Sequence, residues 1–344
     1  MHVKSFCRSS CSHSAIAALP AIIACCILCC ALLPLTLPIP AETLNTTVIG
    51  TFPRDMSEFA HIDLKAARKF AWFEPLRDAL VPRNFQLFNQ FVASVSLDPD
   101  SQVDALYWGV VTLPERGEQV VGVAVGSFDP SAIADRFQNE KLPSFDLHGF
   151  KLYAFGTGEG PGDIFFTLLD SDTAAFGQRA ALEKLVDVRT GASERLFVNE
   201  TLFPLIDEAS NSDAMLWAVL DHTYALQVMR RFVPAAMQFP QTAAIADRLK
   251  ALTIGVDPRS DNEIDLAFQA VCSSADDANT LAAALQVALM YRRYLSSDDD
   301  PAISAILDGA RVTPRGDRLE LDFSFTQEQF QSFVLSSAHP ARNF

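Results

Sequence analysis

The pattern of apolar and polar positions along the chain predicts alternating strands and helices from residue 56 onward. "EFAHID", "ALYWGVV" and "QVVGVAVG" have the apolar content and period of strands, and "LPERGE" predicts the turn between the second and the third. "WFEPLRDALVPRNFQLFNQFVASV" has helical spacing, with Phe85, Phe88, Val92 and Val95 three or four residues apart. The pattern therefore predicts an α+β fold in which mostly antiparallel sheet is packed with helices.

The second half of the chain repeats this order of elements. "AMLWAVLD", "ALTIGVD", "NEIDLAFQAV" and "DRLELDFSF" are predicted strands, and capping pairs at Ser274/Asp277 and Thr326/Gln329 predict helix starts. Both halves follow the order strand, helices, two strands, helix, strands, helix. We therefore expect two related units, 56–192 and 193–344, preceded by a signal or membrane-anchor segment at 1–41 and a linker at 42–55.

The two predicted units differ in the faces of their strands. In the second unit Ile264, Leu266 and Phe268 alternate with polar residues, which predicts a sheet with one face in water. In the first unit the strand around Val121 is apolar on both sides, and one side carries small residues. That face consists of Val120, Gly122, Ala124 and Gly126. We expect it to be covered by the protein's own helices or the other unit, or else to line a groove for an apolar ligand or a partner.

The first 41 residues have the pattern of a membrane-targeting segment. Lys4 and Arg8 precede an apolar run from Ala15 to Leu33, and no acidic residue occurs before Glu42. Three interpretations remain open: a single-pass transmembrane helix, a signal peptide cleaved near Ala41, or a lipoprotein modified at Cys25. Because the positive flank comes first, each of them places the remaining chain on the extracytoplasmic, for example periplasmic, side of a membrane.

The net charge of the remaining chain narrows the classes of partner, and the positions of the cysteines bear on metal binding. Residues 42–344 contain 25 Lys/Arg and 42 Asp/Glu, a net charge of −17, which disfavours nucleic acid and anionic lipid surfaces. Six of the seven cysteines lie in the first 30 residues, four of them inside the apolar run, where no metal site is expected. Cys272 follows a strand pattern and is interpreted as a small buried hydrophobe.

The stretch "FGTGEGPGD", residues 155–163, holds four of the fifteen glycines and resembles a phosphate-binding loop. A dinucleotide loop requires a following helix, and a Walker loop requires a following Lys-Ser/Thr pair. Here "IFFTLLD" follows, which is a strand pattern. We therefore interpret the stretch as the turn of a β-hairpin.

The sequence lacks the common motifs of zinc hydrolases and of serine nucleophiles. No H-E-x-x-H, G-x-S-x-G or S-x-x-K pattern occurs, and the acidic runs at 257–265 and 296–301 lack EF-hand spacing. His148 and His222 are interpreted as surface or capping residues, and the sequons at Asn45 and Asn199 matter only in a host that glycosylates. We predict no catalytic residue, no metal and no cofactor, while enzymatic activity itself stays open.

A stretch in the first unit resembles uncharacterised bacterial envelope proteins. It runs "VVGVAVGSFDPSAIADRF", "GFKLYAF" and "FTLLDSDTAAFGQRAALEKLVD". The resemblance implies an exported α+β protein and transfers no catalytic residue. We expect a membrane-tethered extracytoplasmic binding protein, a scaffold or accessory subunit with a protein partner in the envelope. The alternative is a carrier or sensor of an apolar, lipid-like ligand, and the third hypothesis is an extracytoplasmic enzyme of unknown reaction.

Overall fold

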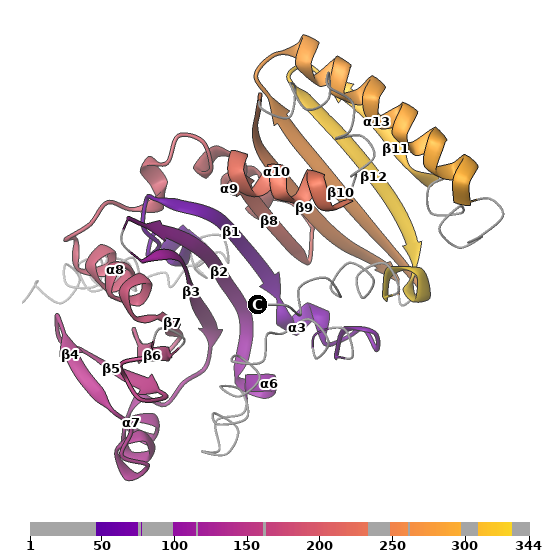
Figure 1. Ribbon diagram of the computed structural model, residues 1–344. Coiled ribbons are helices and arrows are strands. Elements are labelled where there is room, and N and C mark those ends of the chain that lie inside the picture. The colour runs from indigo at the N-terminus through magenta and orange to yellow at the C-terminus, as the bar shows by residue number, and fades with distance from the viewer. Residues whose placement is uncertain are drawn as a thin grey trace, which may run out of the picture. The chain divides into compact units, whose positions relative to one another are not determined.

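A computed structural model describes residues 46–74, 77, 99–114, 116–160, 163–232, 248–260, 262–296 and 309–331. From Asn45 onward the chain forms one compact unit built around a single twelve-stranded sheet (Figure 1). The strands are β1 (Met56–Asp63), β2 (Val103–Leu113), β3 (Gly117–Gly126), β4 (Ser144–Leu147), β5 (Phe150–Phe155), β6 (Ile164–Leu168), β7 (Thr173–Gln178), β8 (Leu216–Asp221), β9 (Leu249–Ser260), β10 (Glu263–Cys272), β11 (Arg311–Arg315) and β12 (Arg318–Thr326). The α+β class predicted from the sequence is confirmed.

Helices connect the strands and pack on both faces of the sheet. They are α3 (Leu64–Ala67), α6 (Pro99–Gln102), α7 (Pro130–Asn139), α8 (Arg179–Thr190), α9 (Phe203–Ser210), α10 (His222–Phe232) and α13 (Ala275–Ser296), with a 3-10 turn η1 (Leu196–Val198). Their predicted starts are confirmed where caps were expected. Asp129 accepts hydrogen bonds from the N–H groups of Ser131 and Ala132 at the start of α7.

The later capping predictions are also confirmed. The N–H of Asp277 donates to the Ser274 hydroxyl, which in turn donates to the Asp277 carboxylate. Thr326 and Gln329 exchange the two reciprocal hydrogen bonds of a capping box, at 2.8 and 3.3 Å. The local signals that begin a helix are therefore read correctly from the sequence at these positions.

Every neighbouring pair of strands is antiparallel, and the order across the sheet is β11-β12-β10-β9-β8-β1-β2-β3-β7-β6-β5-β4. The first and second halves of the chain meet where β1 pairs with β8, with Ala60 opposite Ala218. We call this β1–β8 pair the seam. The strands follow the same order on both sides of the seam: three consecutive strands, then two in reverse order. They are β1-β2-β3-β7-β6 on one side and β8-β9-β10-β12-β11 on the other. Their relation as two repeats, divided near residue 192, stays a prediction.

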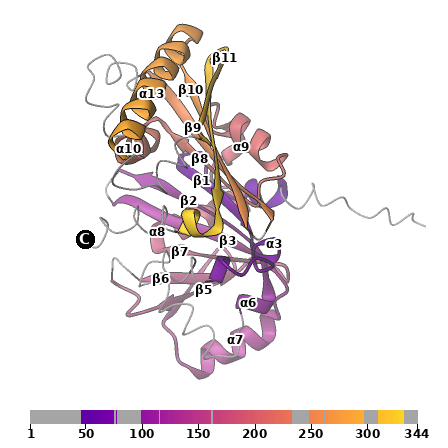
Figure 2. The ribbon, with the colours of Figure 1, turned by 90° about the vertical axis from the view of Figure 1, so that its right-hand side faces the viewer.

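The two faces of the sheet carry different helices. Along β8, Trp217 and Val219 belong to a core with α8, η1 and α9, whereas Leu220 belongs to a core with α10 and α13. Because neighbouring residues of a strand point to opposite faces, the two sets of helices cover opposite faces. In Figures 1 and 2, α13 accordingly runs along the outer strands of the second half.

The predicted wet face of the second half is confirmed. Ile264 and Leu266 are buried, whereas Glu263 is exposed and Asp265 is half-buried. The wet face holds a network of charges, in which the Arg259 guanidinium donates to Asp265 at 2.8 Å and Arg318 contacts Glu208 of α9. Alternation along one strand is thus enough to predict which face meets water.

The predicted linker at 42–55 differs from the structure over its described part. Residues 46–49 form a helical turn, and Val48, Ile49 and Phe52 are almost fully buried in the core beneath α8 and η1. The backbone of Arg54 also bonds to that of Glu194, so this segment is part of the compact unit. Three apolar residues at i, i+1 and i+4 were too few for a helical pattern to be recognised.

Two further predictions concern residues beyond those described. The anchor or signal segment at 1–41 and most of the predicted helices between 75 and 98 lie outside the described residues. Within the part of the chain that the structure describes, no helix is both long and apolar enough to span a membrane.

Candidate ligand pocket at the seam

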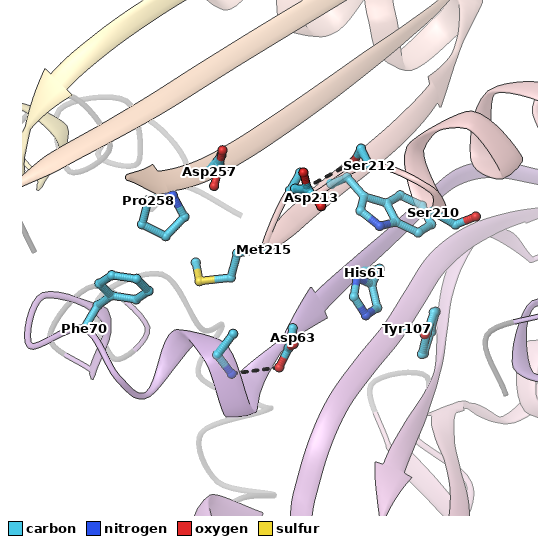
Figure 3. Close-up of a pocket in the computed structure, with 13 residues that line it drawn as sticks. His61, Asp63, Phe70, Tyr107, Ser210, Ser212, Asp213, Met215, Asp257 and Pro258 are labelled. Atoms are coloured by element: carbon cyan, nitrogen blue, oxygen red, sulfur yellow. Dashed lines mark hydrogen bonds between the residues drawn. The ribbon is translucent and has the colours of Figure 1, made fainter. Parts of the chain in front are cut away.

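A pocket of about 360 Å³ lies at the end of the seam, where β1, β2, β8 and β9 come together (Figure 3). It is lined by His61, Asp63, Ala66, Phe70, Tyr107, Ser210, Ser212, Asp213, Ala214, Met215, Trp217, Asp257 and Pro258. We call it the seam pocket. Its lining comes from both halves of the chain, because only the β1–β8 pairing brings these segments together.

The wall of the seam pocket is a row of three rings that the strand register places side by side. His61 of β1 lies opposite Tyr107 of β2 and opposite Trp217 of β8. The ring centroids are 4.5 Å apart for His61 and Tyr107 and 5.4 Å apart for His61 and Trp217. Phe59, two residues before His61 on the same face, also contacts both outer rings and supports the row from the core side.

Burial in this aromatic row sets the protonation state of His61. Desolvation lowers the pKa of His61 to about 4, although the nearby Asp63 carboxylate favours the charged form. The imidazole is therefore neutral at neutral pH. Its Nδ1 atom is buried and has no hydrogen-bond partner among the described residues. A buried polar atom left unpaired is costly, and native proteins keep few of them.

Carboxylates give the rim of the pocket its charge. Asp63 caps α3 by accepting from the N–H of Ala66 at 2.8 Å, and its own N–H donates to the Met215 carbonyl. Asp213 is exposed in the loop between α9 and β8. Asp257 lies 3.5 Å from the guanidinium of Arg259. The thirteen lining residues include these three acids and no lysine or arginine.

The polar groups of the seam pocket are not arranged as a known catalytic centre. The Ser212 hydroxyl donates to the Ala209 carbonyl, and that of Ser210 donates to the Asp207 carbonyl, so both serve the end of α9. A serine nucleophile would instead need a hydrogen bond to a base such as His61. No group of three or more His, Cys, Asp or Glu side chains within the described ranges could hold a metal ion.

The small-residue face predicted from the sequence lies elsewhere in the sheet. Gly122 packs against the ring of Phe176 on β7, and Gly126 lies against the backbone of Gln102. Ala124 is buried in the core, and the N–H of Val120 donates to Gln178 at 2.8 Å. The close approach at this face is thus made by neighbouring strands and turns of the same chain. None of the four residues lines the seam pocket.

The glycine-rich stretch connects β5 to β6, which pair antiparallel, so the hairpin interpretation is confirmed. Its backbone does form an anion cradle, and the anion is the chain's own Asp163. The carboxylate accepts from the N–H groups of Gly158 and Gly160, at 2.7 and 3.0 Å, and from the Thr157 hydroxyl at 3.0 Å. The loop resembles a phosphate site because its backbone N–H groups also bind an anion, which here is the carboxylate of Asp163.

The remaining candidate residues from the sequence lie in a turn, in the core and at a helix start. His148 occupies a turn with φ of 51° and contacts Asp187 at 3.0 Å. Cys272 is buried beneath α13, and burial raises the pKa of its thiol to about 11. The carboxylate of Asp221 accepts from the N–H of Tyr224 at the start of α10, next to His222.

The sequon at Asn199 is engaged in the fold. Its side-chain amide donates to the Arg54 carbonyl at 2.8 Å, and its oxygen accepts from the N–H groups of Thr201 and Leu202. Asn199 lines a second pocket of about 530 Å³, which also contains Asp221, Arg248 and Lys250. That pocket has mixed charge, unlike the seam pocket.

Sequence reasoning missed the seam pocket. The signal in "EFAHID" was a histidine between apolar neighbours on a strand, but its partners Tyr107 and Trp217 are distant in the chain. Only the register of three strands unites them. A histidine in a strand ordinarily has its hydrogen bonds satisfied. That Nδ1 of His61 has no partner among the described residues is seen only in the three-dimensional structure.

Comparisons with known proteins leave the site to be interpreted from its own geometry. No protein-family model and no curated protein matches the chain. Among solved structures, crystal form I of TP0453 is similar with 13% identity and a TM-score of 0.49, over 85% of this chain and 98% of that one. Crystal form IV of TP0453 gives 12% identity and a TM-score of 0.47, over 83% and 96%. Likeness at this level carries no functional argument.

Proposed function

We propose that this chain is a membrane-tethered extracytoplasmic binding protein and that the seam pocket is its ligand site. The observation that carries the proposal is the seam pocket itself, a hollow of about 360 Å³ lined by segments from both halves of the chain. Its lining combines aromatic side chains with the carboxylates of Asp63, Asp213 and Asp257, and apolar surface with a few polar groups is typical of ligand sites.

The chemistry of the lining favours a small polar ligand over a lipid tail. Lipid-binding cavities are lined mainly by apolar side chains. The seam pocket instead carries the carboxylates of Asp63, Asp213 and Asp257 and two serine hydroxyls beside its rings. The proposed tether is the apolar segment from Ala15 to Leu33, and the acidic composition of the rest supports an exported domain.

A scaffold or accessory-subunit role is the second candidate, and one surface favours it. On α13, Val287, Met290 and Tyr291 are 49%, 59% and 57% exposed and lie three and four residues apart on one side of the helix. Apolar groups gathered on a helix face are typical of surfaces that contact another protein. This role is compatible with a ligand site at the seam.

The experiment is affinity purification of the tagged full-length chain from membranes in a mild detergent, with mass spectrometry of bound small molecules and proteins. Ala66→Trp places a large side chain into the seam pocket, and Ala71→Trp makes the same change at an exposed alanine that does not line it. We expect a small molecule with the wild type and with Ala71→Trp, and its loss with Ala66→Trp. Retention of every bound molecule by Ala66→Trp would contradict the proposal.

A further inference from the structure

We propose that two copies of this chain pair through the outer face of α13, with the two helices antiparallel. The inference goes beyond the ligand site, because no residue of α13 lines the seam pocket. It names the partner for the surface that favours a scaffold role. It is carried by the composition of this face, by the sizes of its side chains and by the charges at the two ends of the helix.

The outer face of α13 is exposed and uncharged. On its inner side α13 packs on β10, β11 and β12, and Leu281, Leu285 and Ala288 are buried there. The helix runs along these strands at one end of the sheet (Figures 1 and 2). The exposed residues from Asn279 to Tyr291 make up the outer face, and they are Asn279, Thr280, Ala283, Gln286, Val287, Met290 and Tyr291.

The absence of charge from this face is unusual for a surface helix. No Asp, Glu, Lys or Arg occurs in the sequence from Ala278 to Tyr291, whereas surface helices ordinarily turn charged side chains to water. The shorter helix α8 carries five, namely Arg179, Glu183, Lys184, Asp187 and Arg189. Because the whole chain has a net charge of −15, its copies repel one another, and an uncharged face is where they can approach.

The side chains of the outer face match an antiparallel copy of themselves in size. Three couples of exposed residues lie equally far from Leu285 along the helix: Asn279 with Tyr291, Thr280 with Met290, and Ala283 with Val287. Two antiparallel helices that cross at Leu285 place the members of each couple opposite one another. In every couple the N-terminal residue is the smaller one, so each large apolar side chain meets a smaller one of the partner. Such interdigitation is how helix faces pack.

The charges at the ends of α13 select the antiparallel arrangement. The first turn contains Asp276 and Asp277, of which Asp276 is exposed and Asp277 pairs with Arg248. Arg292 and Arg293 follow the outer face near the C-terminal end. Since Leu285 lies at the middle of α13, antiparallel copies overlap along their length and bring the acidic end of each beside the basic end of the other. Parallel copies would instead bring like charges and like helix-dipole ends together.

The size of this face predicts a reversible dimer. One face of a single helix is smaller than the area of about 800 Å² per partner that a standard interface buries. We therefore expect a dissociation constant in the micromolar range. The pairing of a face with itself also gives closed two-fold symmetry, so the assembly stops at the dimer.

The test is sedimentation velocity of the full-length chain in mild detergent with a reducing agent, from about 1 to about 100 μM. We expect a monomer–dimer equilibrium for the wild type. Val287→Glu places a charge at the centre of the contact and is expected to weaken the dimer at least about tenfold. Val198→Glu is the matched control, because Val198 is 47% exposed, close to the 49% of Val287, and lies in η1 outside α13. It should keep the wild-type equilibrium.

A mixing experiment tests the antiparallel register. Ala283→Lys and Val287→Glu should each be monomeric where the wild type is dimeric, because each places two like charges close to the two-fold axis. In an equimolar mixture the new lysine of one chain faces the new glutamate of the other, and we expect dimers to return. Circular dichroism of each variant checks that it is folded.

Three results would overturn the inference. They are a wild type that stays monomeric up to about 100 μM, equal effects of Val287→Glu and Val198→Glu, and a mixture of the two charged variants that stays monomeric. None of them bears on the ligand site, which Ala66→Trp tests separately.

Discussion

At the scale of single residues, His61 combines a stability cost with a position in the seam pocket. Its neighbours Tyr107 and Trp217 desolvate the ring, and no described group bonds to Nδ1. Residues held at a cost to the fold tend to occur at functional sites. The account therefore predicts that an apolar ring in place of His61 stabilises the fold.

His61→Phe is expected to raise the free energy of unfolding at pH 7 by about 1 kcal/mol, because it removes the unpaired atom and keeps the ring. Thermal or denaturant unfolding of the full chain measures the change. A loss of stability at pH 7 would show that His61 is a structural residue.

The pH dependence of stability follows from the lowered pKa of His61. Between pH about 6.5 and about 4 the unfolded chain binds a proton at this residue and the folded chain does not, so stability falls as the pH falls. The full difference amounts to about 3 kcal/mol at pH 4 and below. His61→Phe should flatten the profile in this window.

At the scale of elements, the β5–β6 hairpin depends on a carboxylate inside its own loop. Asp163→Ala leaves the N–H groups of Gly158 and Gly160 without their acceptor and is expected to cost about 1–2 kcal/mol. Asp163→Asn keeps one acceptor and should cost less. The wild-type loop should show no binding of inorganic phosphate by titration, and binding would contradict the internal-anion account.

Local elements were predictable, because their signals lie within a few residues. Asp129 before Pro130 and the Ser274/Asp277 pair define helix starts, and alternation around Leu266 defines a strand with one wet face. The glycine loop was correctly read as a turn from the strand that follows it. The self-supplied anion was not predicted, since a list of residues does not show which way Asp163 points.

The site could not be predicted from the sequence, because it depends on long-range register. Nothing in "EFAHID" indicates that β1 would pair with β8 as well as with β2. The small-residue face was a better sequence signal, yet Gly122 is explained by the ring of Phe176 on the next strand. Small residues mark close approach, and the sequence does not say what approaches.

At the scale of the whole molecule, the seam makes the two halves one sheet. Phe59 and Tyr107 of the first half share a core with Trp217 and Val219 of the second. Since this core crosses the seam, we expect a single cooperative unfolding transition, coincident by far-ultraviolet circular dichroism and by tryptophan fluorescence. Two separated transitions would show that the halves are independent domains and that the pocket between them is not rigidly formed.

The most direct test of the ligand site is native mass spectrometry of the intact full-length chain, released from mild detergent. The account predicts one small-molecule adduct per chain for the wild type and for Ala71→Trp, and bare protein for Ala66→Trp. An adduct that persists in Ala66→Trp, or its absence from all three proteins, would contradict a ligand site at the seam.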